Sequence, residues 1–406
     1  MAFFELITPL KAREIIKSNI KSLQKTEGIK VTEALGRVTA EDILASEDLP
    51  AFTKSVMDGY ALRAEDSFGA SEEKPKTLEL VGEVEMGAEP KVTVESGQAV
   101  KIPTGGMLPA GAEGVIMIEE TALKGDKLTI YNSISPGENI VAQGSDIETG
   151  QVVLASEHRL RAQDIGMLAG LGIAEVSVYR RPKVGVISTG NELISLNEER
   201  HLGQTRDINT YSLCSLVEEL GAIAVPGGII EDNEESLKEA VINLVDQVDF
   251  IVVSGGSSVG VKDVTYTVLN ELGDSEVLIH GIAIKPGKPT IFNLVEGVPA
   301  YGLPGHPVSA MVVFKKFVAP YIEAVMGGEQ EKRHIEAEFS QNLSSDPGRE
   351  DYIRVKLKKE ATGWVAKPVQ GESSLMMTMV AADGLVKVPW SKEGLAAGEV
   401  VRVELF

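Results

Sequence analysis

The segment Lys183-Val184-Gly185-Val186-Ile187-Ser188-Thr189-Gly190-Asn191-Glu192 decides the fold class, because an apolar run passes directly into a glycine turn. The run predicts a buried strand over 183–189. Further strands are predicted over 249–254 and near 299–303, and helices over 211–220, 234–245, near 264–272 and from 307 to about 325. Strands and helices that alternate in this way predict a parallel sheet sandwiched between helices, an α/β domain.

The chain before this segment has a different pattern of apolar and turn residues. At the N-terminal side, Thr8 and Pro9 suit a helix cap and the first helical position, and an apolar face follows at Leu10, Ile15, Ile16, Ile20 and Leu23. Short strand-like runs separated by turn residues then occupy 49–146, and helical spacing resumes at 161–171. The β unit is therefore expected to be an insertion in a helical framework.

Strand patterns return after residue 327, at 335–339, 352–358, 363–368 and 400–405, and predict a small closing β-barrel. The sequence thus predicts a multidomain α/β plus β protein in four parts. These are a discontinuous N-terminal framework domain (1–48 with 147–181), an inserted all-β domain (49–146), an α/β domain (182–327) and a C-terminal β-barrel domain (328–406).

Composition excludes several classes of protein. The 406 residues include 39 Lys plus Arg against 60 Asp plus Glu, a net charge of −21 that repels nucleic acid and anionic lipid. The single cysteine, Cys214, allows no intrachain disulfide and no thiolate zinc cluster. No signal peptide and no uncharged apolar stretch of about eighteen residues is visible, so we expect a cytoplasmic protein.

Three glycine-rich turns follow predicted strands, at 188–193, 254–260 and 302–309. In a parallel α/β sheet, ligands bind beyond the carboxyl ends of the strands, where glycines and free amides can approach phosphate or another oxyanion. One such turn would be explained by geometry alone, but three at one edge predict a binding site. Its candidate ligand-binding residues are Gly255, Gly256, Ser257, Ser258, Pro304, Gly305, His306, Pro307 and Ser309.

The segment Ile284-Lys285-Pro286-Gly287-Lys288-Pro289 presents two lysines in a loop stiffened by prolines. In an acidic chain, two fixed cations beside glycine turns favour a local anion site. If the neighbouring glycine turns were absent, the simpler interpretation would be that these lysines are ordinary surface residues of a Pro-Gly loop.

Three carboxylates, Glu192, Asp232 and Asp263, lie at or just beyond the predicted strand ends. Together with an anion site they could hold Mg²⁺, which takes oxygen ligands and bridges phosphates. Asp58 and Thr104 would be ordinary turn residues on composition alone, and neither a Ser–His–Asp set nor a metalloprotease motif is evident.

The motifs together resemble those of a known family. The strings VMDGYA (56–61), PTGG (103–106), SGG (254–256), IKPGKP (284–289) and GLPGHPVSA (302–310) are similar, in the same order, to those of the bacterial MoeA family of molybdopterin molybdenumtransferases. The C-terminal part of gephyrin belongs to the same family. The resemblance extends over essentially the whole chain and implies that residues 182–327 form its molybdopterin-binding domain.

The resemblance implies the last step of molybdenum cofactor assembly, in which molybdate and adenylated molybdopterin react, with Mg²⁺ present, and AMP leaves. It also implies a homodimer in which Asp58 and Thr104 reach into the partner's cleft. Other assembly proteins and apo-molybdoenzymes are the implied protein partners. The implied functional residues are the acids Glu192, Asp232 and Asp263, the oxyanion-holding Lys285, Lys288 and Ser309, and Arg349 and Ser374 from the C-terminal domain.

This chain departs from the family pattern at Asn191, Ser257, His306 and Asp383. The departures leave the proposed acids and lysines in place, but they leave open whether molybdate or tungstate is the oxyanion. Two other functions are considered beside the transferase, a molybdopterin-binding scaffold without activity and a molybdopterin adenylyltransferase. The retained acids and lysines argue against the scaffold, and the additional β unit argues against the adenylyltransferase.

Overall fold

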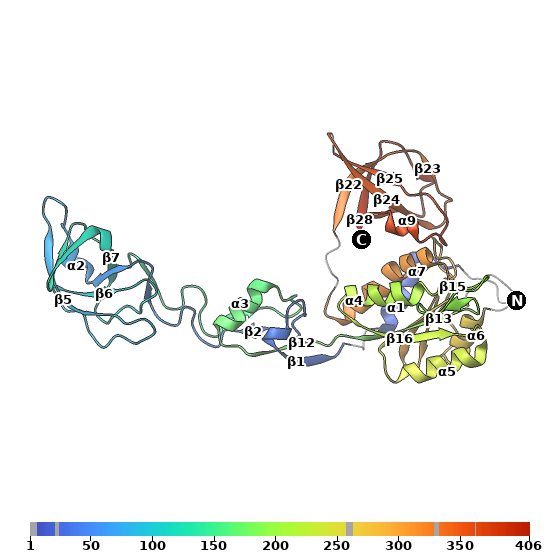
Figure 1. Ribbon diagram of the computed structural model, residues 1–406, viewed down its shortest axis with the longest axis horizontal. Coiled ribbons are helices and arrows are strands. Elements are labelled where there is room, and N and C mark those ends of the chain that lie inside the picture. The colour runs from blue at the N-terminus through green and yellow to red at the C-terminus, as the bar shows by residue number, and fades with distance from the viewer. Residues whose placement is uncertain (1–5, 21–23, 257–262, 329–332, 362) are drawn as a thin grey trace. The chain divides into compact units, whose positions relative to one another are not determined.

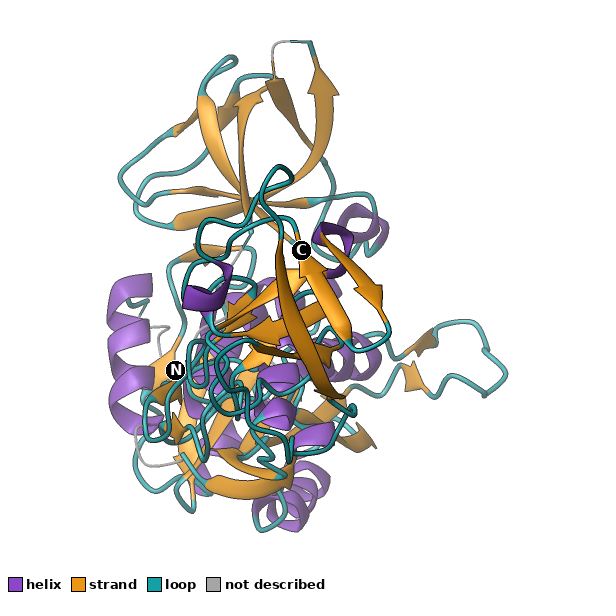
Figure 2. Cartoon of the chain, turned by 90° about the vertical axis from the view of Figure 1, so that its left-hand side faces the viewer, coloured by secondary structure: helices purple, strands orange, loops and turns teal. Residues whose placement is uncertain are grey.

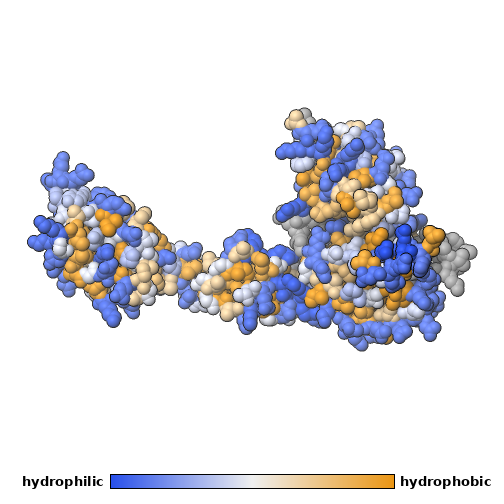
Figure 3. Space-filling model, in the orientation of Figure 1, coloured by the Kyte–Doolittle hydropathy of each residue, from blue (hydrophilic) through white to orange (hydrophobic). Residues whose placement is uncertain are grey.

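The computed structural model describes residues 6–20, 24–256, 263–328, 333–361 and 363–406. The chain forms two compact units, one made of residues 1–27 with 179–406 and the other of residues 28–178 (Figure 1). In the described ranges, no helix combines the length and the apolar character that crossing a membrane requires. Hydrophilic residues cover much of the surface of both units in the view of Figure 3, in keeping with the net charge of −21.

The larger unit contains a six-stranded sheet in the order β16-β13-β17-β21-β20-β18. The first four strands are parallel and the last two pair antiparallel, so the predicted parallel sheet is confirmed and carries two antiparallel strands at one edge. The strands are β13 (Lys183–Thr189), β16 (Ile223–Ile230), β17 (Phe250–Ser254), β18 (Ile279–His280), β20 (Ile291–Val295) and β21 (Val298–Leu303).

Helices cover both faces of this sheet (Figure 1). Side chains alternate along each strand, so Val252 belongs to one core while its neighbours Ile251 and Val253 belong to the other. One face packs on α1 (Pro9–Ile20), α4 (Asn209–Glu219), α7 (Pro307–Val313), a π-helical turn η3 (Phe314–Val318) and α8 (Ala319–Val325). The other packs on α5 (Glu234–Val245) and α6 (Val264–Glu271).

The N-terminal helix α1 begins as predicted, because the Thr8 hydroxyl accepts a hydrogen bond from the Lys11 N–H at 3.2 Å. Its buried face differs from the predicted one. Ile16 and Ile20 are buried together with Ala12, whereas Leu10 is 67% exposed. Ala12 lies one helical turn before Ile16 and takes the core position, which turns Leu10 away. Leu23 lies outside the described residues.

The C-terminal part of the larger unit is a closed barrel, shown with its strands in orange in Figure 2. Five strands pair in a ring, and the short β19 (Ile284–Lys285) adds to β24 from the α/β domain. The strand that closes the ring, β26, was not among the predicted ones. The ring consists of β22 (His334–Phe339), β24 (Glu350–Glu360), β25 (Gly363–Pro368), β26 (Gly384–Val388) and β28 (Val400–Leu405).

The smaller unit, residues 28–178, holds a six-stranded sheet in the order β7-β4-β6-β5-β9-β8. Its strands are β4 (Gly59–Leu62), β5 (Lys76–Glu83), β6 (Gln98–Ile102), β7 (Gly114–Met117), β8 (Thr121–Lys124) and β9 (Lys127–Ile130). The rest of this unit contains α3 (Ala162–Gly170) and short paired strands such as β2 (Ile43–Leu44) and β11 (Val152–Leu154). The predicted four-part boundaries remain predictions, although α1 packs in the core of the α/β domain.

Candidate functional site

The carboxyl ends of β17 and β21 meet at a network of polar side chains that includes the buried Asn209 and Ser254. Asn209 donates from Nδ2 to Ser254 Oγ and to the Gly305 carbonyl oxygen, both at 2.8 Å. Ser254 in turn donates to the Pro304 carbonyl oxygen at 3.3 Å. These bonds hold two of the predicted glycine turns together at one edge of the sheet.

Gly255 in this network has a conformation that only glycine adopts without strain. Its φ is +113°, and a Cβ at this position would lie 2.1 Å from the Thr189 carbonyl oxygen. The turns after β13 and β17 therefore touch backbone to backbone. Of the other residues predicted in this turn, Gly256 is described, whereas Ser257 and Ser258 lie outside the described residues.

A cavity of about 740 Å³ opens between the α/β domain and the barrel. Its α/β wall includes the predicted Lys285, Lys288, Pro304, His306 and Ser309. Its barrel wall is formed by residues 343–344, 346–349, 351–354 and 368–373. The lysine loop and the third glycine turn, predicted from separate motifs, thus face one space.

The cations of this cavity differ in whether a carboxylate already binds them. Arg349 donates from Nε to Asp351 at 2.8 Å, and its Nη2 lies 2.8 Å from Asp346. Among the described residues, neither Lys285 nor Lys288 forms an ion pair. Both therefore remain available to an external anion.

Arg354 is a cavity residue that sequence reasoning missed. It donates to the Thr378 hydroxyl at 2.6 Å and to the Gly371 carbonyl oxygen at 2.7 Å, and within the described ranges it has no carboxylate partner. Burial lowers the pKa of its guanidinium. The predicted Arg349 is instead neutralised by its own loop. Only the ion pairs of Arg349 with Asp346 and Asp351 show which of the two arginines is already neutralised.

His306 joins the two walls of the cavity. Its Nδ1 lies 2.9 Å from Ser373 Oγ, and the Val308 N–H donates to the Ser373 carbonyl oxygen at 3.1 Å. These two contacts join the start of α7 to the barrel. The barrel serine that lines the cavity is Ser373, whereas the predicted Ser374 is exposed and does not line it.

Two of the three predicted acids interact at the neighbouring strand ends. Asp263 caps α6 by accepting a hydrogen bond from the Tyr266 N–H at 2.9 Å, and its Oδ2 is buried with no partner among the described residues. Burial raises the pKa of Asp263 to about 6; the bond from Tyr266 opposes this rise, and the nearby charge of Asp232 adds to it. Asp232 accepts from the Thr189 hydroxyl at 3.3 Å.

Glu192 does not complete a three-acid cluster with this pair. Its carboxylate lies over Gly190, where a Cβ would meet Glu192 Oε2 at 2.9 Å. Within the described ranges, no three acidic, histidine or cysteine side chains lie close enough together to hold a metal ion. A metal at this edge would therefore rely on Asp232 and Asp263.

Asp58 and Thr104, taken from separate motifs of the β unit, are hydrogen-bonded to each other. The Thr104 N–H and hydroxyl donate to Asp58 Oδ1 at 2.7 and 3.0 Å. These two bonds lower the pKa of Asp58 and hold its exposed carboxylate ionised on the surface of the smaller unit.

The fold defines a class of protein, a doubly wound α/β protein with a cavity beside the turn that follows β21, at the carboxyl edge of its sheet. Comparison with known families divides the chain in the same order. Residues 7–172 match the MoeA N-terminal region (domain I and II), residues 185–324 a probable molybdopterin binding domain, and residues 336–406 the MoeA C-terminal region (domain IV). The chain belongs to the MoeA family.

Individual relatives agree over the full length. A putative molybdopterin biosynthesis protein of Methanocaldococcus jannaschii is 35% identical and covers 100% of both chains. The molybdopterin molybdenumtransferase of Haemophilus influenzae is 35% identical over 99% of both chains. Two solved MoeA proteins of Pyrococcus horikoshii have TM-scores of 0.89 and 0.84 at 38% and 31% identity, each covering 99% of this chain and 99% and 100% of their own.

Proposed function

We propose that this chain inserts molybdenum from molybdate into adenylated molybdopterin and releases AMP. The observation that carries the proposal is the set of three cations, Lys285, Lys288 and Arg354, that face one cavity without carboxylate partners among the described residues. Molybdate is a dianion and the adenylated pterin carries phosphates, so a cationic cavity in a chain of net charge −21 suits both substrates.

The residues of the chain divide into two tasks. Lys285, Lys288 and Arg354 bind the oxyanion or pterin phosphate and offset the charge that develops when the phosphoanhydride bond breaks. Pro304 and Ser309 line the cavity wall on which the pterin would lie, and Gly255, Gly256 and Pro307 belong to the adjoining segments. We place the exposed Glu192 as a substrate contact at the first strand end.

The chemistry of Asp232 and Asp263 fits Mg²⁺. The buried, unpartnered Oδ2 of Asp263 and its electrostatic coupling to Asp232 supply the oxygen donors that a hard cation prefers. When bound, Mg²⁺ neutralises phosphate charge. The two carboxylates would hold it, and their ionisation is required for that binding.

The homodimer, cytoplasmic location and transfer to apo-molybdoenzymes remain part of the same proposal. Asp58 and Thr104 would then contribute from the partner subunit. Their exposed, ionised arrangement supports a role in contacting a ligand beyond their own unit.

The test is an assay with purified protein, adenylated molybdopterin, Mg²⁺ and either molybdate or tungstate. We expect AMP release and activation of an apo-molybdoenzyme, both dependent on the oxyanion and neither requiring ATP. Substrate binding without either product would favour a scaffold, and consumption of ATP would favour an adenylyltransferase. The oxyanion that gives half-maximal rate at the lower concentration is the preferred one.

A further inference from the structure

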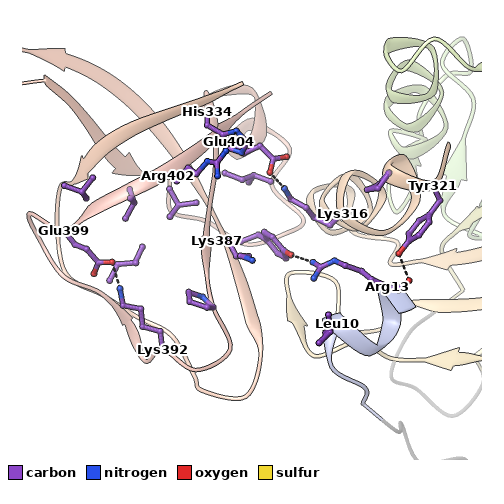
Figure 4. Close-up of a pocket in the computed structure, with 18 of the residues that line it drawn as sticks. Leu10, Arg13, Lys316, Tyr321, His334, Lys387, Lys392, Glu399, Arg402 and Glu404 are labelled. Atoms are coloured by element: carbon purple, nitrogen blue, oxygen red, sulfur yellow. Dashed lines mark hydrogen bonds and ion pairs between the residues drawn. The ribbon is translucent and has the colours of Figure 1, made fainter. Parts of the chain in front are cut away.

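Arg13, Glu350 and Tyr352 form a closed hydrogen-bonded cluster, here called the buried triad, that joins α1 to β24. Arg13 Nη2 donates to Glu350 Oε2 at 3.1 Å and to Tyr352 Oη at 3.0 Å, and Tyr352 Oη donates to the same Glu350 oxygen at 2.6 Å. Figure 4 shows Arg13 extending from α1 at a second cavity, of about 880 Å³, between this helix and the barrel.

The surroundings of the buried triad restrict Arg13 to this arrangement. Tyr321 donates to the Arg13 carbonyl oxygen at 2.9 Å, and the guanidinium lies 5.0 Å from the Phe317 ring centroid. Glu350 and Tyr352 are 7% and 3% exposed. Burial alone would raise the pKa of Glu350, yet hydrogen bonds from Tyr352 and Arg13 hold it below its ordinary value. The cluster therefore keeps an ion pair in which Glu350 is buried and the Arg13 side chain is 34% exposed.

The same strand carries part of the anion cavity. The Glu350 N–H donates to the Ala283 carbonyl oxygen at 2.9 Å. The strand β19 runs parallel to β24, and in this backbone register Lys285 lies opposite Asp351. Arg354 lies further along β24. Tyr352, itself a member of the triad, lines both cavities, so the triad borders the cavity that holds Lys285 and Arg354.

We propose that Arg13 is a positioning residue for oxyanion binding. It fixes the start of β24 through Glu350 and Tyr352, and β24 fixes Lys285 and Arg354 at the spacing that the anion requires. The inference rests on the proposed function, because that function assigns Lys285 and Arg354 to the oxyanion.

The test compares Arg13→Met with the matched control Lys17→Met in the full chain. Both residues lie on α1 and line the second cavity, and Lys17 is exposed. We expect Arg13→Met to raise the KM for molybdate about ten-fold with kcat changed less than about two-fold, because misplaced cations weaken anion binding. Lys17→Met should leave both constants unchanged, and Arg13→Lys should recover part of the KM.

A double variant separates positioning from stability. Arg13→Met alone leaves the buried Glu350 with Lys387, whose Nζ lies 3.9 Å from Glu350 Oε1, as its remaining cationic partner and should lower Tm. Arg13→Met with Glu350→Leu removes both charges of the Arg13–Glu350 pair and should regain Tm. If Arg13 acts by positioning β24, the KM for molybdate should stay raised in the double variant. A KM that returns to normal together with Tm, or one that never rises, overturns the proposal.

Hydrogen exchange of the amides at 283–288 supplies a readout that needs no activity. Faster exchange in Arg13→Met than in Lys17→Met supports positioning, and equal exchange overturns it. If the unmodified protein releases no AMP with either oxyanion, the proposed function fails, and the exchange comparison still decides the role of Arg13.

Discussion

Asp263→Asn should stabilise the metal-free protein at high pH while abolishing activity. Burial raises the pKa of Asp263 to about 6 from an ordinary value of 3.8. The folded state therefore holds the proton more tightly than the unfolded state, so this carboxyl group favours folding below pH 3.8 and loses that contribution as pH rises through about 6. The asparagine side chain retains an oxygen that can accept from Tyr266 and cap α6.

A pKa difference of this size corresponds to about 3 kcal/mol. Solvent screening at the half-buried Asp263 reduces the expected gain to about 1–2 kcal/mol at pH 8. At pH 4 most of the gain should be lost, because the aspartate of the folded protein is then largely protonated and as uncharged as asparagine.

The assay is urea unfolding at pH 8 and pH 4 in the presence of a chelator, followed by the AMP-release assay with Mg²⁺. Asp246→Asn, which removes an exposed carboxylate at the end of α5, serves as the control and should show no pH-dependent gain. The reasoning would be refuted if Asp263→Asn were no more stable than the unmodified protein at pH 8, or if it were stabilised equally at both pH values. Full activity in Asp263→Asn would remove this residue from the metal site.

Three further results are expected. Lys285→Ala should raise the KM for molybdate at least about ten-fold, which a rate with unchanged dependence on molybdate would contradict. Asp58→Ala and Asp263→Ala should each be folded and inactive. If each cleft uses residues of both subunits, an equal mixture of the two variants, unfolded and refolded together, should regain about a quarter of the activity. No recovery would indicate that each cleft lies within one subunit. Gly255→Ala should cost more than about 2 kcal/mol, since its Cβ would lie 2.1 Å from a carbonyl oxygen, whereas Gly221→Ala, with a φ of +89° but open space, should cost about 1 kcal/mol by urea unfolding. Equal losses at the two glycines would contradict the steric argument.

The strands and glycine turns of the α/β domain were predictable because their signals are local. A buried apolar run followed by glycine defines β13 and β17 without knowledge of their neighbours. The convergence of the turns followed from the rule that parallel strands end at one edge, and the Asn209 bonds confirm that two of them meet.

The barrel wall of the cavity could not be predicted at the level of single residues. Arg349 and Arg354 stand five positions apart, and only the ion pairs of Arg349 with Asp346 and Asp351 show that the first is already neutralised. Ser373 and Ser374 are adjacent, so their difference depends on which one faces His306. Such distinctions arise from tertiary contacts that carry no periodic signal in the sequence.

The place of α1 also depended on distant contacts. Its helix signal was clear, but its partners Phe317 and Tyr321 follow about 300 residues later, as the sequence separation of 308 between Arg13 and Tyr321 shows. No local pattern shows which core a helix joins when its partners lie so far along the chain. The sequence therefore predicted a buried Leu10, which is exposed in the structure.

This separation also affects how the chain folds during synthesis. Residues 28–178 form a compact unit that is fully synthesised before the strands of the α/β sheet exist. At roughly 5–20 residues per second, α1 waits on the order of 15–60 s for Tyr321, with Ile16 and Ile20 still without their core. Residues 28–178 can therefore fold before α1 is buried, because α1 packs on helices that are synthesised about 300 residues later.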